Sequence, residues 1–338
     1  MNSIDKIIFS ILEEDDEPKK YNALFIPRRV ERRKIDRLEW AKRILQQEHI
    51  EGDLDLSDLP IVDLGNLESI TGNLDLSNTN ITDLGPLELV GGWLDLRDTP
   101  ITSLGSLKSV NEDLYLSGTP IITLKPLELV GGYLDLRNTP INSLGSLKSV
   151  GGCLNLWSTS ITSLGSLESV GGYLDLSNTP ITNLGSLESV DGDLNLYGTP
   201  ITSLGSLKSV GGYLNLWNTP ITNLGSLESV DGDLDLRNTS ITNLGSLESV
   251  DGWLNLHNTP ITSLGSLKFV GKDLDLSNTP IISLGSLERV GGDLDLSGTP
   301  ITDLGSLQSV GKIVIDKNSK LDINSLPEYF KYKIGIKS

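Results

Sequence analysis

The sequence of 338 residues has little of what most enzymes use for chemistry. It contains one cysteine, Cys153, and two histidines, His49 and His257. A single cysteine cannot form a disulfide within the chain, so a reducing compartment fits it. No glycine-rich phosphate loop stands between a strand and a helix, and the recurring Gly-Ser-Leu has no partner histidine in each repeat. We therefore expect no catalytic residues, no cofactor and no enzymatic activity.

Long hydrophobic runs are also missing. No apolar stretch approaches the roughly 18 residues that a membrane-spanning helix needs. The first residues, Met1 to Lys6, lack a basic region, and the short apolar run to Leu12 is followed by acidic residues rather than by a small-residue cleavage site. These absences predict no signal peptide, no membrane contact and a cytoplasmic location.

Basic residues are scarce in most of the chain. The whole sequence has 27 Lys and Arg against 45 Asp and Glu, a formal charge of -18. Residues 51–310 contain 10 basic and 32 acidic residues, which gives -22, whereas residues 1–50 carry +1 and residues 311–338 carry +3. This acidity argues against binding of a phosphate backbone by the central part of the chain.

What the sequence does contain is a repeat of thirteen 20-residue units over residues 51–310. We number the places of a unit from 1 to 20, with Gly171 at place 1. Leu174 and Leu176 alternate with polar residues, which indicates a strand with one buried face. From Ile181 to Val190 the apolar residues recur every third position, which favours an extended or 3₁₀-like return path over an α-helix. Each unit is thus one coil of a solenoid, and stacked coils share one core.

The pattern of Leu174, Leu176, Thr179 and Ile181 resembles the leucine-rich repeat L-x-x-L-x-L-x-x-N-x-L over residues 51–310. The resemblance implies a repeat solenoid with a parallel β-sheet on one face, extended or 3₁₀ return segments and a helical N-terminal cap. The near identity of the units is compatible with bacterial or viral members of that family. Two departures, Gly171 at the family's first leucine and threonine in place of its asparagine ladder, leave a right-handed parallel β-helix as the alternative.

Glycine is frequent, and we expect it to serve different purposes at different places of the unit. Places 1 and 2 retain a Gly or Asn in every unit, which predicts one residue with a positive φ there. Place 15, held by Gly185, is occupied once by Lys125 before Pro126. Because a residue before proline prefers extended angles, we expect the glycine at place 15 to serve close packing of coils.

The two ends differ from the repeat, and we expect four segments: 1–20, 21–50, 51–310 and 311–338. Residues 3–14 predict an amphipathic helix, followed by an acidic linker; this helix either packs on the cap or docks in a partner's groove. Residues 28–45 predict a basic amphipathic helix that caps the first coil or, less favoured, contacts nucleic acid. The last segment fits an altered repeat that lacks one residue, closed by Leu326, Tyr329, Phe330 and Tyr332.

Places 3, 5 and 7 should point outward together, because side chains alternate along a strand. These places carry most of the aromatic residues and all vary between otherwise similar units. Where place 7 is aromatic or histidine, place 5 is asparagine; where place 7 is arginine, place 5 is aspartate, which can pair with it. A partner site is expected at Trp93, Arg97, Tyr115, Tyr133, Arg137, Trp157, Tyr173, Tyr197, Tyr213, Trp217, Arg237, Trp253 and His257.

Two alternatives to a partner site remain open at these places. Aromatic residues favour exposed strand positions anyway, and units copied from one another inherit paired residues without selection for binding. The aspartates at place 5 offer oxygen ligands for Ca²⁺, but asparagines interrupt them, so we expect no metal.

The sequence thus favours a non-catalytic protein-protein interaction module that binds another protein on the strand face. The alternatives are a structural scaffold that uses its terminal helices and an acidic DNA mimic or nucleic-acid-associated factor.

Overall fold

The computed structural model describes residues 36–337. The chain divides into two compact units, residues 1–43 and 44–338. Residues 36–44 form a helix. The expected helix at 3–14, the acidic linker and the start of the basic helix lie outside the described residues. Within the described part, no helix is long and apolar enough to cross a membrane.

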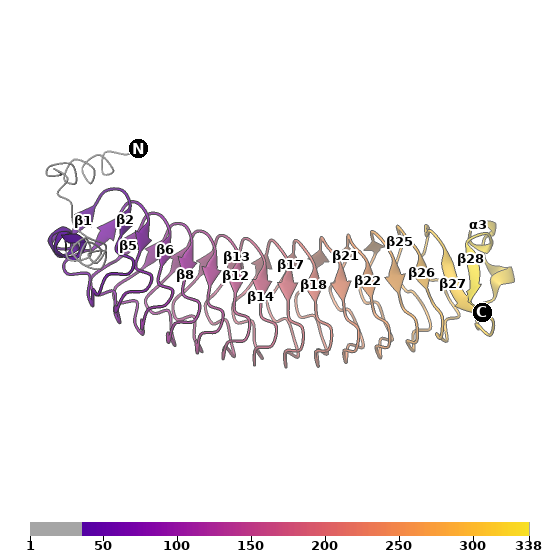
Figure 1. Cartoon of the computed structure of the whole chain (residues 1–338). Coiled ribbons are helices and arrows are strands. Elements are labelled where there is room, and N and C mark those ends of the chain that lie inside the picture. The colour runs from indigo at the N-terminus through magenta and orange to yellow at the C-terminus, as the bar shows by residue number, and fades with distance from the viewer. Residues whose placement is uncertain (1–35, 338) are drawn as a thin grey trace, which may run out of the picture. The chain divides into compact units, whose positions relative to one another are not determined.

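The second unit is a solenoid in which each repeat forms one coil, and the coils follow one another in chain order (Figure 1). Places 4 and 5 form a 15-stranded parallel sheet with two longer strands after the last repeat. Its strands are β2 (Leu54–Asp55), β4 (Leu74–Asp75), β6 (Leu94–Asp95), β8 (Leu114–Tyr115), β10 (Leu134–Asp135), β12 (Leu154–Asn155), β14 (Leu174–Asp175), β16 (Leu194–Asn195), β18 (Leu214–Asn215), β20 (Leu234–Asp235), β22 (Leu254–Asn255), β24 (Leu274–Asp275), β26 (Leu294–Asp295), β27 (Ile313–Asp316) and β28 (Ile334–Lys337).

A second, 13-stranded parallel sheet forms from places 19 and 20 of the coils and from the two residues that precede the first coil. Its strands are β1 (His49–Ile50), β3 (Ser69–Ile70), β5 (Leu89–Val90), β7 (Ser109–Val110), β9 (Leu129–Val130), β11 (Ser149–Val150), β13 (Ser169–Val170), β15 (Ser189–Val190), β17 (Ser209–Val210), β19 (Ser229–Val230), β21 (Ser249–Val250), β23 (Phe269–Val270) and β25 (Arg289–Val290).

The predicted solenoid with a parallel sheet is confirmed, and the second sheet adds to it. In both sheets each residue pairs with its equivalent 20 positions on, as Leu174 does with Leu194 and Val170 with Val190. The return path is extended where it ends, so equivalent segments of neighbouring coils lie at strand spacing and bond to one another.

The core is a column of aliphatic side chains from places 4, 6, 11, 14, 17 and 20. In the coil that begins at Gly171, all six of these residues, from Leu174 to Val190, are at most 2% exposed. Burial of each such side chain contributes about 1.5–3 kcal/mol relative to leaving it in water. A single coil has no second layer to cover its leucines, so this stabilisation requires stacking.

Threonine at place 9 replaces the asparagine ladder of the leucine-rich repeat. In the twelve coils that have it, the hydroxyl donates to the carbonyl at place 6 of the same coil, as Thr179 Oγ1 does to Leu176 O at 2.6 Å. Eleven of the twelve threonines are buried. The hydroxyl thus satisfies one carbonyl at the corner of each coil, which removes the cost of burying that group.

The prediction of a positive φ at places 1 and 2 is wrong. The prediction of close packing at place 15 is confirmed in every second coil, as at Gly185, where a Cβ would lie 2.3 Å from the carbonyl oxygen of Gly165. Positive φ angles recur at place 8, as in Asn178 (58°), and at place 15, as in Gly185 (63°), while among glycines at places 1 and 2 only Gly52 of the described residues has one. A Cβ on Gly171 would lie 2.2 Å from the carbonyl oxygen of Gly151 in the preceding coil. Places 1 and 2 therefore need glycine for close approach, and place 8 uses residues that tolerate the left-handed region.

The return segments join the coils in pairs. Isolated parallel bridges at place 13 link coils two by two: Asp83 with Ser103, Thr123 with Ser143, Ser163 with Asn183, Ser203 with Asn223, Asn243 with Ser263, and Ser283 with Asp303. Within the described residues no such bridge at place 13 joins one pair to the next. The structural repeat from residue 71 to residue 310 is therefore 40 residues long, twice the sequence repeat.

The C-terminal end closes the 15-stranded sheet with β27 and β28. Leu294 pairs with Ile313, an offset of 19 that matches a coil one residue shorter. A 3₁₀ turn, η1 (Ile323–Ser325), and a short helix, α3 (Glu328–Lys331), lie between these two strands. Phe330 is buried and Tyr329 packs on its ring, whereas Tyr332 is 85% exposed and closes nothing.

Candidate interaction surface

We define the strand face as the side chains at places 3, 5 and 7 of the thirteen coils. Place 5 differs from the expectation that all three places point outward alike. In twelve coils its side-chain oxygen accepts a hydrogen bond from the backbone N–H of place 7, as Asn155 Oδ1 does from Trp157 N at 3.0 Å. The exception is Tyr115. Aspartate and asparagine at place 5 thus hold the turn after the strand, because both carry the required oxygen.

The three arginines of the strand face each pair with the aspartate two residues before them, which confirms the pairing expected from the sequence. Arg237 approaches Asp235 with an Nη2 to Oδ2 distance of 2.6 Å, and Arg97 and Arg137 repeat the arrangement. Asp235 is 0% exposed beneath its arginine. The hydrogen bond with Asp235 raises the pKa of Arg237 above its usual value. These guanidinium groups are neutralised within the chain.

Tyrosines and an asparagine form a first cluster over β8 to β14. The rings of Tyr115 and Tyr133 meet edge to face at 6.1 Å, and the guanidinium of Arg97 lies 5.2 Å from the centre of the Tyr115 ring. Asn155 Nδ2 donates to the hydroxyl of Tyr173 at 3.0 Å. Burial raises the pKa of Tyr133. These side chains hold one another in place through stacking and hydrogen bonds.

A second cluster lies over β16 to β22. The rings of Tyr197 and Trp217 are 5.2 Å apart, and Arg237 lies 5.0 Å above the Trp217 ring. The ring centres of Tyr213 and Trp253 are 5.9 Å apart although one coil lies between their coils in the stack. Burial is the largest cause that raises the pKa of Tyr213, to about 12.

The remaining predicted residues lie outside these ring contacts. Trp157 is 41% exposed, and neither Trp157 nor Trp93 contacts another ring or a cation within residues 36–337. His257 Nδ1 bonds to Ser277 Oγ at 2.7 Å. Arg137 pairs with Asp135. The structure therefore brings most of the predicted residues into two clusters, whereas Trp157, although its coil lies within the first cluster, makes no ring contact there.

Aromatic residues at place 3 alternate with short side chains, and the coil pairs explain why. The backbone N–H of each aromatic is bound by the side chain at place 3 of the preceding coil, as Tyr213 N is by Asp193 Oδ1 at 2.8 Å. The other aromatic pairs are Trp93 with Asn73, Tyr133 with Asp113, Tyr173 with Cys153, and Trp253 with Asp233. An aromatic ring offers no such acceptor, and a short polar residue or cysteine precedes each of these aromatic residues. The alternation is visible in the sequence, but its cause lies in contacts between coils.

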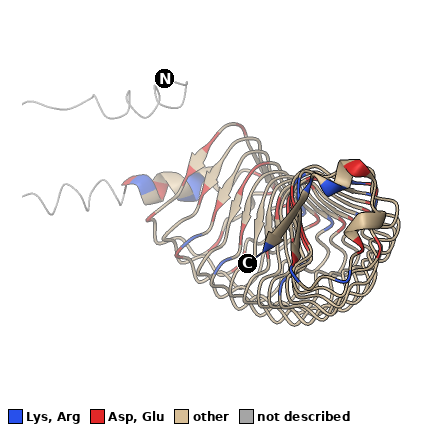
Figure 2. Cartoon of the chain, turned by 90° about the vertical axis from the view of Figure 1, so that its right-hand side faces the viewer, with Lys and Arg blue, Asp and Glu red and all other residues tan. Residues whose placement is uncertain are grey.

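The strand face is acidic. Places 3 and 5 hold 6 and 8 aspartates, 14 in all, against 3 arginines at place 7. Along the coils, acidic residues recur from one repeat to the next and outnumber the basic residues (Figure 2). Because the arginines are paired, the unpaired charge of this face is negative, which favours a cationic partner.

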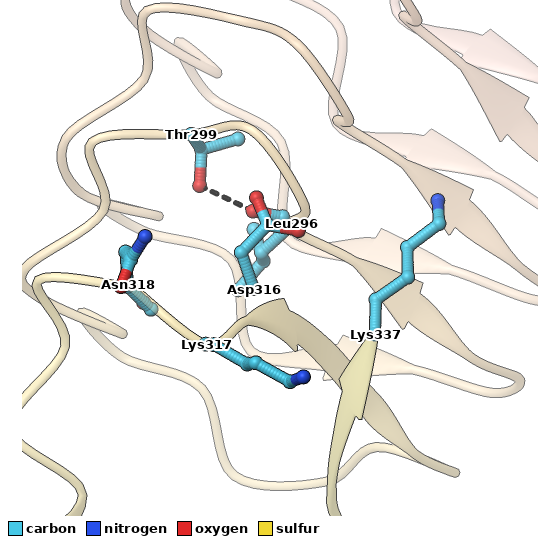
Figure 3. A pocket seen from close by; sticks show the side chains of 7 residues that line it. Leu296, Thr299, Asp316, Lys317, Asn318 and Lys337 are labelled. Atoms are coloured by element: carbon cyan, nitrogen blue, oxygen red, sulfur yellow. Dashed lines mark hydrogen bonds between the residues drawn. The ribbon is translucent and has the colours of Figure 1, made fainter.

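Polar side chains also come together at two sites outside the strand face. A hollow of about 340 Å³ at the C-terminal end is lined by Leu296, Thr299, Asp316, Lys317, Asn318, Ser319 and Lys337 (Figure 3). Its Asp316 already accepts from Gly298 N at 2.5 Å, and Lys337 lies 3.5 Å from Asp295. Near the other end of the solenoid, Glu48, His49 and Glu68 place three possible metal-ligand atoms within 4.8 Å. All three are exposed, so water competes for these ligands and we assign them no metal.

Comparison with known proteins adds little to this geometry. No protein-family model matches the chain, and no curated protein does. YopM from Yersinia enterocolitica WA-314 is a solved structure similar to 99% of this chain over 99% of its own length, with 15% sequence identity and a TM-score of 0.25. The coils themselves decide the class. The chain is a leucine-rich-repeat-like β-solenoid with a buried threonine ladder.

Proposed function

We propose that the solenoid is a non-catalytic protein-binding module and that a partner protein docks on its strand face. The observation that carries the proposal is the exposure of large aromatic side chains there: Trp157 is 41% exposed and Trp217 is 38% exposed. The core of each coil is complete without them. Tryptophan, tyrosine and arginine are the residues that contribute most to protein-protein interfaces.

The rigidity of this surface supports the same function. Thirteen strands at about 4.8 Å give a sheet roughly 60 Å long. Tyr197 and Trp217 pack on each other, and Arg237 is held by Asp235 as it covers Trp217. Side chains that are already ordered lose less conformational entropy when a partner binds.

A protein is favoured over a nucleic acid as the partner. Each arginine of the strand face already pairs with an aspartate, and most charged side chains of this face are aspartates. Such a surface repels phosphate groups. A cytoplasmic location, without membrane contact, belongs to the same proposal.

The test is affinity capture from a lysate with the full chain and with a Trp157→Ser, Trp217→Ser double variant. We expect the double variant to lose the partner and to keep its thermal stability nearly unchanged, because neither side chain belongs to the core. Tyr332→Ser is the matched control, since Tyr332 is an exposed aromatic outside the strand face. Capture of the same protein by the double variant would contradict the proposal.

A further inference from the structure

One contact within the chain shows how this surface binds a guanidinium group. Arg237 at place 7 lies over the ring of Trp217, which is at place 7 of the preceding coil, with 5.0 Å between the guanidinium carbon and the ring centre. The same group bonds to Asp235, with 2.9 Å from Nε to Oδ1 and 2.6 Å from Nη2 to Oδ2. The indole thus lies against the face of one planar cation, and the carboxylate binds the edge of that cation that carries Nε and Nη2.

Trp157 and Asp175 occupy the same places of their coils as Trp217 and Asp235, but no arginine follows Asp175. Trp157 is at place 7 of its coil, and Asp175 is at place 5 of the next coil, as Trp217 and Asp235 are. Place 7 of that next coil is Ser177, whose N–H and hydroxyl both donate to Asp175 Oδ1. Within residues 36–337, Asp175 Oδ2 accepts no hydrogen bond and Asp175 forms no ion pair.

The exposure of the two carboxylates agrees with this comparison. Asp235 is 0% exposed beneath Arg237, whereas Asp175 is half-buried. Trp157 is 41% exposed and has no cation over its ring within the described residues. The carboxylate that receives Nη2 in the complete arrangement is therefore less buried in the incomplete one.

No other coil offers the same combination. After Tyr197 the next place 5 is Asn215, which has no charge. His257 is followed by Asp275 and Ser277, but its Nδ1 already bonds to the Ser277 hydroxyl at 2.7 Å. The combination of an indole, an aspartate and a serine occurs once among the thirteen coils.

We propose that Trp157 and Asp175 form a binding site for the guanidinium group of an arginine on the partner protein. The inference rests on the proposed function and names the partner residue that this part of the strand face recognises. The partner's arginine occupies the position that Arg237 takes beside Trp217: its plane stacks on the Trp157 indole, and one N–H donates to Asp175 Oδ2. An ammonium group lacks the planar fork, so arginine binds in preference to lysine.

The first test uses N-acetyl-arginine methylamide as the probe on the full chain. The chain has five tryptophans, so five indole N–H signals are expected by nuclear magnetic resonance, and a Trp157→Phe variant assigns the one of interest. We expect the probe to shift the Trp157 signal saturably and the matching lysine compound to bind more weakly. Asp175→Asn should weaken the arginine probe about tenfold, because it removes a charge-assisted hydrogen bond. An unshifted signal, or equal binding by Asp175→Asn, would overturn the proposal.

The second test fills the site from within the chain. Ser177→Arg introduces an arginine after Asp175, as at three other coils, and should stack on Trp157. We expect this variant to fold, to shift the Trp157 signal without any probe and to lose the response to the probe. Ser77→Arg is the control: it places the same residue after Asp75, but the preceding place 7 is Ser57, so the probe response at Trp157 should persist.

Partner capture then separates this inference from the proposed function. If Ser177→Arg still captures the partner while the Trp157→Ser, Trp217→Ser variant does not, the arginine site is wrong and the strand face remains the docking surface. If both variants capture it, both proposals are wrong.

Discussion

The coils at the two ends of the repeat and the coils in its middle share one backbone but differ on the strand face. In the end coils place 7 is serine, as in Ser77 and Ser297, and its hydroxyl bonds to the aspartate at place 5. Between residues 91 and 270 the same place holds Arg, Trp, Tyr or His in seven of nine coils. The core places 4, 6, 11, 14, 17 and 20 are aliphatic throughout. Stability and recognition are therefore assigned to different places of the unit, and one can vary without the other.

The largest effect on stability is expected when a core leucine is shortened, and it should be equal in the end coils and in the middle coils. Leu76→Ala, in an end coil, and Leu196→Ala, in a middle coil, each remove a leucine at place 6 that is 0% exposed. Each change should lower the free energy of unfolding by about 2–5 kcal/mol, through lost burial and the cavity left behind. Urea denaturation measures both, and a clear difference between the two variants would show that the cores are not equivalent.

A smaller effect should distinguish the two strand faces. Asp235→Asn leaves the guanidinium of Arg237 without its anion and should cost about 1 kcal/mol, a moderate value because that arginine is 39% exposed and water screens it. Asp275→Asn should change stability by less than about 0.5 kcal/mol, since asparagine at this place still accepts from the N–H of place 7. The same denaturation assay compares them. Equal losses would mean that the Asp235–Arg237 pair adds nothing.

The smallest expected effect on stability comes from the ionisation of Tyr213, which occurs only at alkaline pH. Burial raises its pKa to about 12, so the folded state binds the phenolic proton more tightly than the unfolded chain does. Stability from this group is complete below the unfolded pKa of about 10 and is lost as the pH rises toward 12. Absorbance titration of the phenolates should therefore lose a component near pH 12 in Tyr213→Phe, and that variant should lose less stability between these pH values. An unchanged titration would show that Tyr213 ionises with the other tyrosines.

The sequence predicted the features that one coil determines by itself. Leu174, Leu176 and the apolar residues from Ile181 onward indicated the strand, the return path and the buried column, because their spacing reflects which side chains face inward. The pairing of Arg237 with Asp235 was also predicted, since both lie in one coil. The use of several predicted aromatic residues as a binding site stays a prediction.

Most features that depend on contacts between coils were missed; the close packing at Gly185 is the exception. The second sheet, the glycine at place 1 and the side chain of Asp193 on the N–H of Tyr213 all involve two neighbouring coils. A pattern within 20 residues does not contain these contacts. Place 8 is different: its asparagines tolerate a positive φ and could have indicated the turn, but the glycines at places 1 and 2 drew the assignment instead.

Because the coils are paired, deleting one 20-residue unit has a different effect on the strand face from deleting two. Removing residues 191–210 would bring two aromatic residues, Tyr173 and Tyr213, into successive coils and leave the N–H of the second without its side-chain acceptor. Removing residues 191–230 keeps Tyr173 followed by Asp233 and then Trp253, so the alternation continues. Gain or loss of repeats thus preserves this alternation only in multiples of 40 residues. A gain or loss of one coil interrupts the alternation of aromatic and short side chains at place 3.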